Sequence, residues 1–367
     1  MARVRTGRST RIIRALLLSL VALLVVSLGT VVAVRDQSPT PEPPGMSDRA
    51  LSTTRAATRD LQQQAKALAA ILKDDGDTQQ VLSTAVQTLQ RHQRMLAPAA
   101  TSGQTASAAS PEPTAGQEPT APDTAPSGTA TATKTPEPDL PSLVKAMARS
   151  GRAALDDAAD TTAPVARELA VAGTEQLTTA HALADAAGLP QPELPETPAG
   201  AVPAESHSCG TTEPPADSQK PSAGAQTSPA SARDPAKGVA RQQEVRALQA
   251  TLTGLQRAVY AYETAVPRLS GKAASFAAER LQQHRRMLET GTRTLESACG
   301  RAPVAEPAYL LPDGFRQAPA AGLAAVEEDL VEMYEDLTGL SDGAARQWTL
   351  GALPRASLAA RHWEQLP

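Results

Sequence analysis

Aromatic side chains are scarce in this chain. Its 367 residues include two Phe, four Tyr and two Trp, and all of them fall between Tyr260 and Trp363. Because aromatic side chains supply much of the buried area of a protein core, we expect the best-packed domain near the C-terminus. The preceding residues have no aromatic core available, so they must bury aliphatic side chains or remain unfolded.

The chain also lacks an excess of either charge. It contains 35 Lys and Arg against 39 Asp and Glu, which gives a formal net charge of −4. No basic patch interleaved with aromatics occurs beyond the N-terminus, which argues against a nucleic-acid partner. Nucleotide-binding loops, Ser/His/Asp arrangements and paired catalytic carboxylates are absent as well. The sequence therefore favours a role other than catalysis and indicates no cofactor.

Only two cysteines are present, Cys209 and Cys299, and neither belongs to a CxxC motif or a Cys/His cluster. A structural zinc site is therefore not indicated. In an exported chain the two would be expected to form a disulfide, closing a loop of about 90 residues and stabilising the fold by roughly 4–5 kcal/mol. The alternative is two unpaired thiols.

The N-terminus predicts a membrane anchor. Arginines at five positions up to Arg14 precede an uncharged, largely apolar run at residues 15–34. About 20 such residues suffice to cross the lipid bilayer, and the arginines are expected to stay in the cytoplasm. These features predict a single-pass membrane protein that has the bulk of its chain outside the cytoplasm. The alternative is a cleaved signal peptide and secretion, although the apolar run is longer than is typical for such signals.

Proline and small polar residues divide the remainder. The chain contains 31 Pro and 23 Gly, concentrated in stretches that bury too little apolar surface to fold. We predict a basic segment and anchor at 1–35, a helical half at 46–189 with a disordered insert at 98–139, a disordered linker at 190–234 and a four-helix bundle at 235–367. The Thr/Ser/Pro-rich linkers would suit a stalk through a cell wall, or a spacer without a role of its own.

The C-terminal region carries the clearest helical periodicity. Its apolar positions recur at steps of three and four residues, which is typical of helices in a bundle. The inward positions predicted for the second helix include Ala277, Leu281 and His284. Those of the fourth helix are Ala345, Trp348, Ala352, Ala359 and His362.

The two halves share sequence features that indicate a duplication. Residues 89–96 match residues 281–288 at six of eight positions, which aligns His92 with His284. Residues 155–157 followed by Arg167 also correspond to residues 334–336 followed by Arg346 at the same spacing. The alternative is that both halves are merely Ala-rich helical hairpins.

Several C-terminal motifs together resemble a known family. They are Ala258-Val259-Tyr260-Ala261-Tyr262, the Arg/His-rich second helix, Pro307-Ala308-Tyr309, and Glu327-Glu328 leading to Tyr334. They resemble the ferritin-like domain of exported actinobacterial proteins of unknown function, over about Val239 to Trp363. The resemblance implies a ferritin-like four-helix bundle. It also leads us to expect a Glu-His pair before Ala258, where this chain has Leu255-Gln256-Arg257.

A metal site is the alternative to a purely structural bundle. His284, Glu327 and His362 are expected near the interior and could bind iron or another divalent metal, with His92 and His181 in the matching positions of the first half. Ferritin-like metal centres require Glu-x-x-His motifs on two helices, and the chain has none. A buried His with one carboxylate partner more often serves packing.

The leading hypothesis is therefore a membrane-anchored, extracytoplasmic scaffold or binding module of the cell envelope. Its partners would be the lipid bilayer, through residues 15–34, and an envelope protein. The alternative is a divergent ferritin-like protein that stores or oxidises iron. A third hypothesis is a carrier of lipids or small molecules that uses a cavity in the Ala-rich bundle.

Overall fold

The computed structural model describes residues 45–72, 76–97, 139–196 and 235–366. Within these ranges the chain forms eight α-helices, one 3-10 turn and no strand, which confirms the all-α prediction. Residues 46–367 form one compact unit. The predicted anchor, the insert up to residue 138 and most of the predicted linker lie outside the described residues. None of the described helices has the length and apolarity that crossing a membrane requires.

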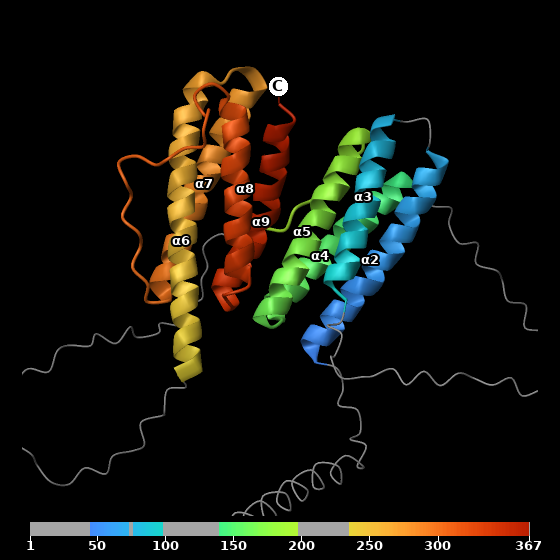
Figure 1. Cartoon of the computed structure of the whole chain (residues 1–367), viewed down its shortest axis with the longest axis horizontal. Coiled ribbons are helices and arrows are strands. Elements are labelled where there is room, and N and C mark those ends of the chain that lie inside the picture. Colours follow the sequence, from blue (N-terminus) through green and yellow to red (C-terminus); the bar gives the residue numbers. More distant parts are fainter. Residues whose placement is uncertain (1–44, 73–75, 98–138, 197–234, 367) are drawn as a thin grey trace, which may run out of the picture. The chain divides into compact units, whose positions relative to one another are not determined.

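The first four helices form the N-terminal bundle (Figure 1). They are α2 (Met46–Ile71), α3 (Gly76–Met95), α4 (Leu140–Asp160) and α5 (Ala163–Ala186). The side chain of Asp139 accepts a hydrogen bond from the Ser142 backbone N–H at 2.8 Å and so caps α4. The core consists of leucine and alanine without aromatics, as the sequence predicts.

Two glycines bring α4 and α5 into backbone contact. A Cβ atom added to Gly151 would lie 2.7 Å from the carbonyl oxygen of Gly173, and one added to Gly173 would lie 2.6 Å from that of Gly151. No side chain fits at this crossing. The short distance between the helices allows a core built largely from alanine to be filled without large residues.

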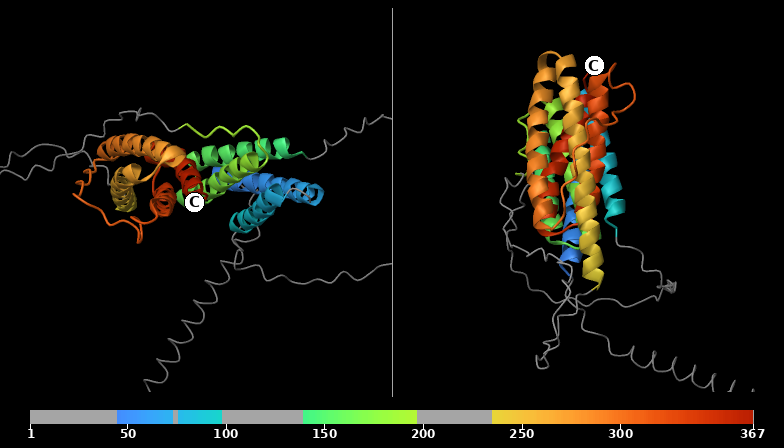
Figure 2. Two further views of the ribbon diagram at one scale, coloured as in Figure 1. Left: turned by 90° about the horizontal axis from the view of Figure 1, so that it is seen from above. Right: turned by 90° about the vertical axis from the view of Figure 1, so that its left-hand side faces the viewer.

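The last four helices form the C-terminal bundle. They are α6 (Pro235–Ala265), α7 (Gly271–Ser297), α8 (Pro319–Thr338) and α9 (Gly343–Glu364), with a 3-10 turn at Val266–Arg268 between the first two. Figure 2 shows their axes lying nearly parallel to one another. Their core is aromatic: Tyr262, Tyr334, Trp348 and Trp363 are each at most 2% exposed.

A long connection, residues 298–318, joins α7 to α8 and runs beside α6 (Figure 1). Side chains of α6 hold it. Gln256 donates to the carbonyl oxygen of Pro303 at 3.1 Å, and Arg257 donates to that of Leu310 at 2.9 Å. The Tyr309 hydroxyl donates to Gln256 at 2.9 Å. The two residues that replace the expected Glu-His pair therefore fix the connection rather than face the bundle centre.

The helices of the two bundles pack in the same order. In each, the first helix contacts the second and third, and the fourth contacts the second and third. The bundles meet where α5 contacts α8 and α9, and α9 contacts α4. Arg346 in α9 donates to the Thr161 carbonyl oxygen beyond the end of α4 at 2.6 Å. Arg167 in α5 pairs with Asp336 in the last turn of α8 at 2.9 Å.

The predicted linker begins later than expected. Residues 190–196 are described, and they lie against the helices instead of leaving them. Arg355 of α9 donates to the carbonyl oxygen of Pro195 at 2.6 Å, and Gln191 donates to Asp185 of α5. The prediction assigned this segment to the linker by its proline content, but proline also suits an extended strap that packs through its carbonyl groups.

Candidate functional site

A cluster of polar side chains lies at the centre of the C-terminal bundle. Each of the four helices contributes to it: Tyr262 from α6, Arg280 and His284 from α7, Glu327 from α8 and Trp363 from α9. None of the five is more than 6% exposed, and Glu327 is fully buried. Buried charge is costly unless it is paired and hydrogen-bonded, so the contacts of Glu327 determine what the cluster can do.

Glu327 accepts four hydrogen bonds. Arg280 binds it through two nitrogens, from Nε to Oε1 at 2.9 Å and from Nη2 to Oε2 at 2.6 Å. The Tyr262 hydroxyl donates to Oε1 at 2.6 Å, and His284 Nε2 lies 2.9 Å from the same oxygen. This is a two-point Arg–carboxylate pair, the strongest common form of ion pair.

The electrostatics favour an ionised carboxylate beside a neutral imidazole. Burial by itself raises the pKa of Glu327, but the charge of Arg280 and the contacts from His284 outweigh it and lower that pKa to about 2. Burial lowers the pKa of His284, and the charge of Arg280 lowers it further, although Glu327 opposes both. A neutral His284 then donates its Nε2 proton to Glu327.

The indole of Trp363 completes the cluster. Its Nε1–H donates to the Tyr262 hydroxyl at 2.7 Å, and this hydroxyl in turn donates to Glu327. The Tyr262 ring lies 5.0 Å from the His284 ring and 6.1 Å from that of Trp363. Burial, followed by the charge of Glu327, raises the pKa of Tyr262 well above its usual value. The phenol therefore stays protonated and acts as a donor.

The three predicted metal ligands do not come together. His284 and Glu327 are in contact, but His362 is exposed and lies against Phe276, with ring centroids 4.0 Å apart. The prediction that His362 faces the interior was wrong. From Ala359 the buried side of α9 continues with a step of four residues to Trp363, whereas the sequence prediction took a step of three.

The cluster does not fit a metal ion. All four hydrogen bonds to the Glu327 oxygens come from protein donors, and the positive charge of Arg280 occupies the position next to the carboxylate that a cation would need. Across the described ranges, no group of three or more His, Cys, Asp and Glu side chains is arranged to hold a metal.

Sequence analysis missed two members of the cluster, Arg280 and Trp363. Charged residues usually lie at the surface, so the charge of Arg280 did not indicate a buried position. A signal was available, because Arg280 precedes His284 by four residues and follows Ala277 by three, which places it on the same side of the helix. Trp363 was missed because the sequence analysis assigned the inward position to its neighbour His362.

The N-terminal bundle contains a smaller counterpart. His92 of α3, fully buried, lies 2.5 Å from a carboxylate oxygen of Glu175 in α5, and Arg91 binds the same oxygen at 2.6 Å. Burial raises the pKa of Glu175, but His92 and Arg91 outweigh it, so the net shift is downward. His181 does not join this pair. It is half-buried, and its Nε2 has no hydrogen-bond partner among the described residues.

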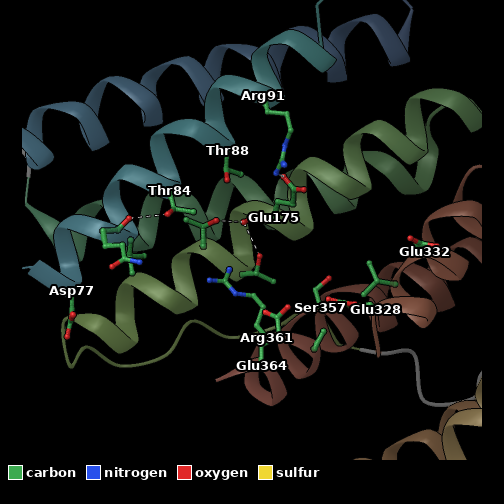
Figure 3. A pocket seen from close by; sticks show the side chains of 16 residues that line it. Asp77, Thr84, Thr88, Arg91, Glu175, Glu328, Glu332, Ser357, Arg361 and Glu364 are labelled. Carbon is green, nitrogen blue, oxygen red and sulfur yellow. Dashed lines mark hydrogen bonds and ion pairs between the residues drawn. The ribbon is translucent and has the colours of Figure 1, made fainter. Parts of the chain in front are cut away.

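A groove of about 860 Å³ lies beside Glu175, between α3 and α5 on one side and α8 and α9 on the other (Figure 3). Carboxylates outnumber guanidinium groups on its walls. Burial, followed by the proximity of Glu364, raises the pKa of Glu328 at this groove. Hydroxyl groups of Thr84, Thr88 and Ser357 also line it. The groove is accordingly polar and acidic.

The predicted disulfide stays a prediction. Cys299 follows the end of α7 with a φ of 61°, a left-handed conformation that is uncommon for a residue other than glycine. Its backbone N–H donates to the carbonyl oxygen of Glu296 at 2.9 Å. Cys209 lies outside the described residues.

Comparison with known proteins identifies similarity in the C-terminal bundle. A family described as Domain of unknown function (DUF4439) matches residues 247–366, a range that contains all five residues of the buried cluster. No curated protein and no solved structure matches the chain. The similarity therefore extends over the C-terminal bundle and assigns no activity to it.

Proposed function

We propose that this protein is a membrane-anchored, extracytoplasmic helical protein that acts as a non-catalytic binding module or scaffold of the cell envelope. The basic residues and the apolar run at 15–34 support the location. The observation that carries the absence of catalysis is the two-point contact of Arg280 with Glu327, at 2.9 and 2.6 Å. It saturates the only acidic side chain in the cluster, so no free carboxylate remains there to act as a base or as a metal ligand.

We further propose a ferritin-like topology for the C-terminal bundle. Its support is the order of contacts, in which α6 packs on α7 and α8, and α9 packs on the same two helices. The long connection between the second and third helices, residues 298–318, agrees with bundles that contain one crossover. In such a bundle the cluster occupies the central position where related folds bind metals.

The N-terminal bundle is proposed to be a degenerate copy of the C-terminal one. The same helix pairs contact each other, and its second and third helices are also separated by a long stretch, residues 96–139. His92, which aligns with His284, also contacts a glutamate, although Glu175 comes from the fourth helix rather than the third. A histidine with a carboxylate partner is thus a shared structural feature of both copies.

Metal analysis of the full-length protein, purified in detergent, tests the absence of a metal centre. The protein is incubated with iron(II), manganese or zinc, dialysed and analysed for bound metal. We expect no stoichiometric metal, because Arg280 holds the carboxylate. Retained metal that is lost in His284→Ala but kept in His362→Ala would replace this proposal with a metal-binding function. His362 is the matched control because it is exposed and outside the cluster.

A further inference from the structure

A second cavity lies beside the buried cluster, on its Arg280 side. It measures about 460 Å³ and is formed by α5, α7, α9 and the described segment 190–196. Its volume is within the range of small-molecule sites, roughly 300–1,000 Å³. Several positive or donor groups line it, together with aromatic side chains. Each of these features can be traced to particular side chains.

Arg280 presents an unused donor at this cavity. It binds Glu327 through Nε and Nη2, so its Nη1 points away from the carboxylate and donates to Gln283 at 2.5 Å. Gln283 also lines the cavity. Because Nη1 carries two protons, one N–H remains without a partner among the described residues. Glu327 thereby holds a nearly buried guanidinium rigidly at the cavity wall.

Two further guanidinium groups line the cavity without a carboxylate partner in the described ranges. Arg355 donates only to backbone carbonyl oxygens, those of Pro195 at 2.6 Å and Gly351 at 2.8 Å. Arg361 lines both this cavity and the acidic groove beside Glu175. Burial lowers the pKa of Arg355, the nearby charge of Arg280 lowers it further, and the charge of Glu196 opposes both. Arg280 and Arg355 therefore repel each other, and an anion placed between them would relieve the repulsion.

Another part of the lining, the aromatic wall, consists of two rings with two leucines beside them. Phe276 of α7 lies against His362 of α9, with ring centroids 4.0 Å apart, and both line the cavity. Leu194 and Leu358 add apolar surface. The negative groups on the walls are Asp185 and Glu279, and the side chain of Asp185 already accepts a hydrogen bond from Gln191.

We propose that this cavity binds a small organic anion, a carboxylate with a flat apolar body, placing its carboxylate near Arg280, Arg355 and Arg361 and its body against Phe276. The planar guanidinium fork matches the geometry of a carboxylate, and the aromatic wall favours a flat molecule over a compact inorganic ion. The inference rests on the proposed binding function and names the class of ligand for it.

Titration of the full-length protein with benzoate tests the proposal, with binding measured by ligand-observed NMR and calorimetry. We expect a Kd on the order of 1 mM or tighter, as suits a ligand of so few atoms. Arg355→Gln and Arg361→Gln should each weaken binding about tenfold, because each removes a charged hydrogen bond. Arg285→Gln is the matched control, because Arg285 lies on the exposed side of α7 and pairs with Glu263.

Two further measurements separate the alternatives. Phe276→Leu should weaken benzoate binding and leave the weaker binding of acetate unchanged, since only the aromatic wall is lost. Phosphate that binds as tightly as benzoate would overturn the assignment of a flat carboxylate. Benzoate binding that is absent, or that survives both Arg355→Gln and Arg361→Gln, would overturn the site itself. None of these outcomes depends on metal content, so failure here is distinguishable from failure of the proposed function.

Discussion

Arg346 and Arg167, which correspond to each other in the proposed duplication, each contact the end of a helix in the other bundle. Arg346 donates to the Thr161 carbonyl oxygen at 2.6 Å, next to the C-terminus of α4, and Arg167 pairs with Asp336 in the last turn of α8 at 2.9 Å. Such an exchange of contacts is the property of a two-fold symmetric interface. This exchange of contacts agrees with the proposed duplication.

The two arginines should contribute unequally to stability. Arg346 is 4% exposed and also lies 3.3 Å from the carbonyl oxygens of Ala158 and Ala159, so Arg346→Gln should cost about 2–4 kcal/mol. The Arg167 side chain is 50% exposed, and Arg167→Gln should cost under about 1 kcal/mol. Urea unfolding followed by far-ultraviolet circular dichroism measures both. If both variants lost the same free energy of unfolding, burial would not determine how much each arginine contributes to stability.

Removing one member of the ion pair between Arg280 and Glu327 should destabilise the protein more than removing both. Glu327→Gln leaves the buried charge of Arg280 without compensation, which typically costs about 3–5 kcal/mol. The double variant Arg280→Met/Glu327→Leu replaces the pair by apolar groups and should lose less than Glu327→Gln alone. Chemical unfolding of the three proteins provides the comparison. A double variant that loses as much stability as Glu327→Gln, or more, would contradict this account.

Acidification should destabilise the C-terminal bundle in two steps. The pKa of His284 is lowered in the folded protein, so the unfolded chain takes up the proton first and stability falls as pH drops below about 6.5. The pKa of Glu327 is lowered to about 2, so a second loss begins below about 4.5 and continues towards pH 2.

Unfolding free energies measured against pH, for the wild type and His284→Asn, test the first step. Between about pH 6.5 and 5 the variant should lose the part of the slope that His284 contributes, while the lowered pKa of His181 leaves a remainder and the later decline persists. Glu289→Gln is a suitable control, because this exposed side chain pairs with Arg293 at the surface. A first step that persists undiminished in His284→Asn would assign it to another group.

The crossing of α4 and α5 should not tolerate a methyl group. Gly151→Ala places a Cβ 2.7 Å from a carbonyl oxygen of the facing helix, so the helices must separate at a cost of about 1–3 kcal/mol. Gly254→Ala is the matched control. Its Cβ would meet the flexible side chain of Met333, which can move, while the helix gains about 1 kcal/mol of propensity. Destabilisation by Gly254→Ala of the same size would argue against backbone contact as the cause.

The apolar run at residues 15–34 should hold the protein in the membrane without being cleaved. The full chain, beginning at its original N-terminus, should remain in the membrane fraction after an alkaline carbonate wash. Leu23→Arg should reduce this fraction, since a charge at the centre of a spanning helix costs about 2.5–3.5 kcal/mol, whereas Leu23→Ile should not. A mature N-terminus that begins after Val34 would instead identify a secreted protein.

Helical periodicity predicted most of the fold because burial repeats with the helix. In α8, for example, the apolar residues that recur at steps of three and four are buried from Leu323 to Leu337. The errors occurred where helical periodicity alone does not decide which side chain is buried. Steps of three and four residues both fit a helix, so only packing distinguishes His362 from Trp363. Arg280 was missed because charged residues usually lie at the surface, and its burial depends on Glu327 from another helix.

The contact of Gly151 with Gly173 could not be predicted from the sequence either. Each glycine alone looks like a weak position in a helix, and only the crossing of α4 and α5 shows that both are required. The small cavity lined by Arg355 was missed for a similar reason, because its walls come from both bundles and from a segment that was predicted to be linker.

The uneven distribution of rings has a practical consequence for spectroscopy. Both indoles, Trp348 and Trp363, belong to α9, and the N-terminal bundle has neither Tyr nor Trp. Ultraviolet emission therefore reports on the last four helices alone, while the peptide signal averages over all eight. Unfolding followed both by fluorescence and by far-ultraviolet circular dichroism would reveal whether the two bundles unfold together or one after the other. No label has to be attached for this comparison.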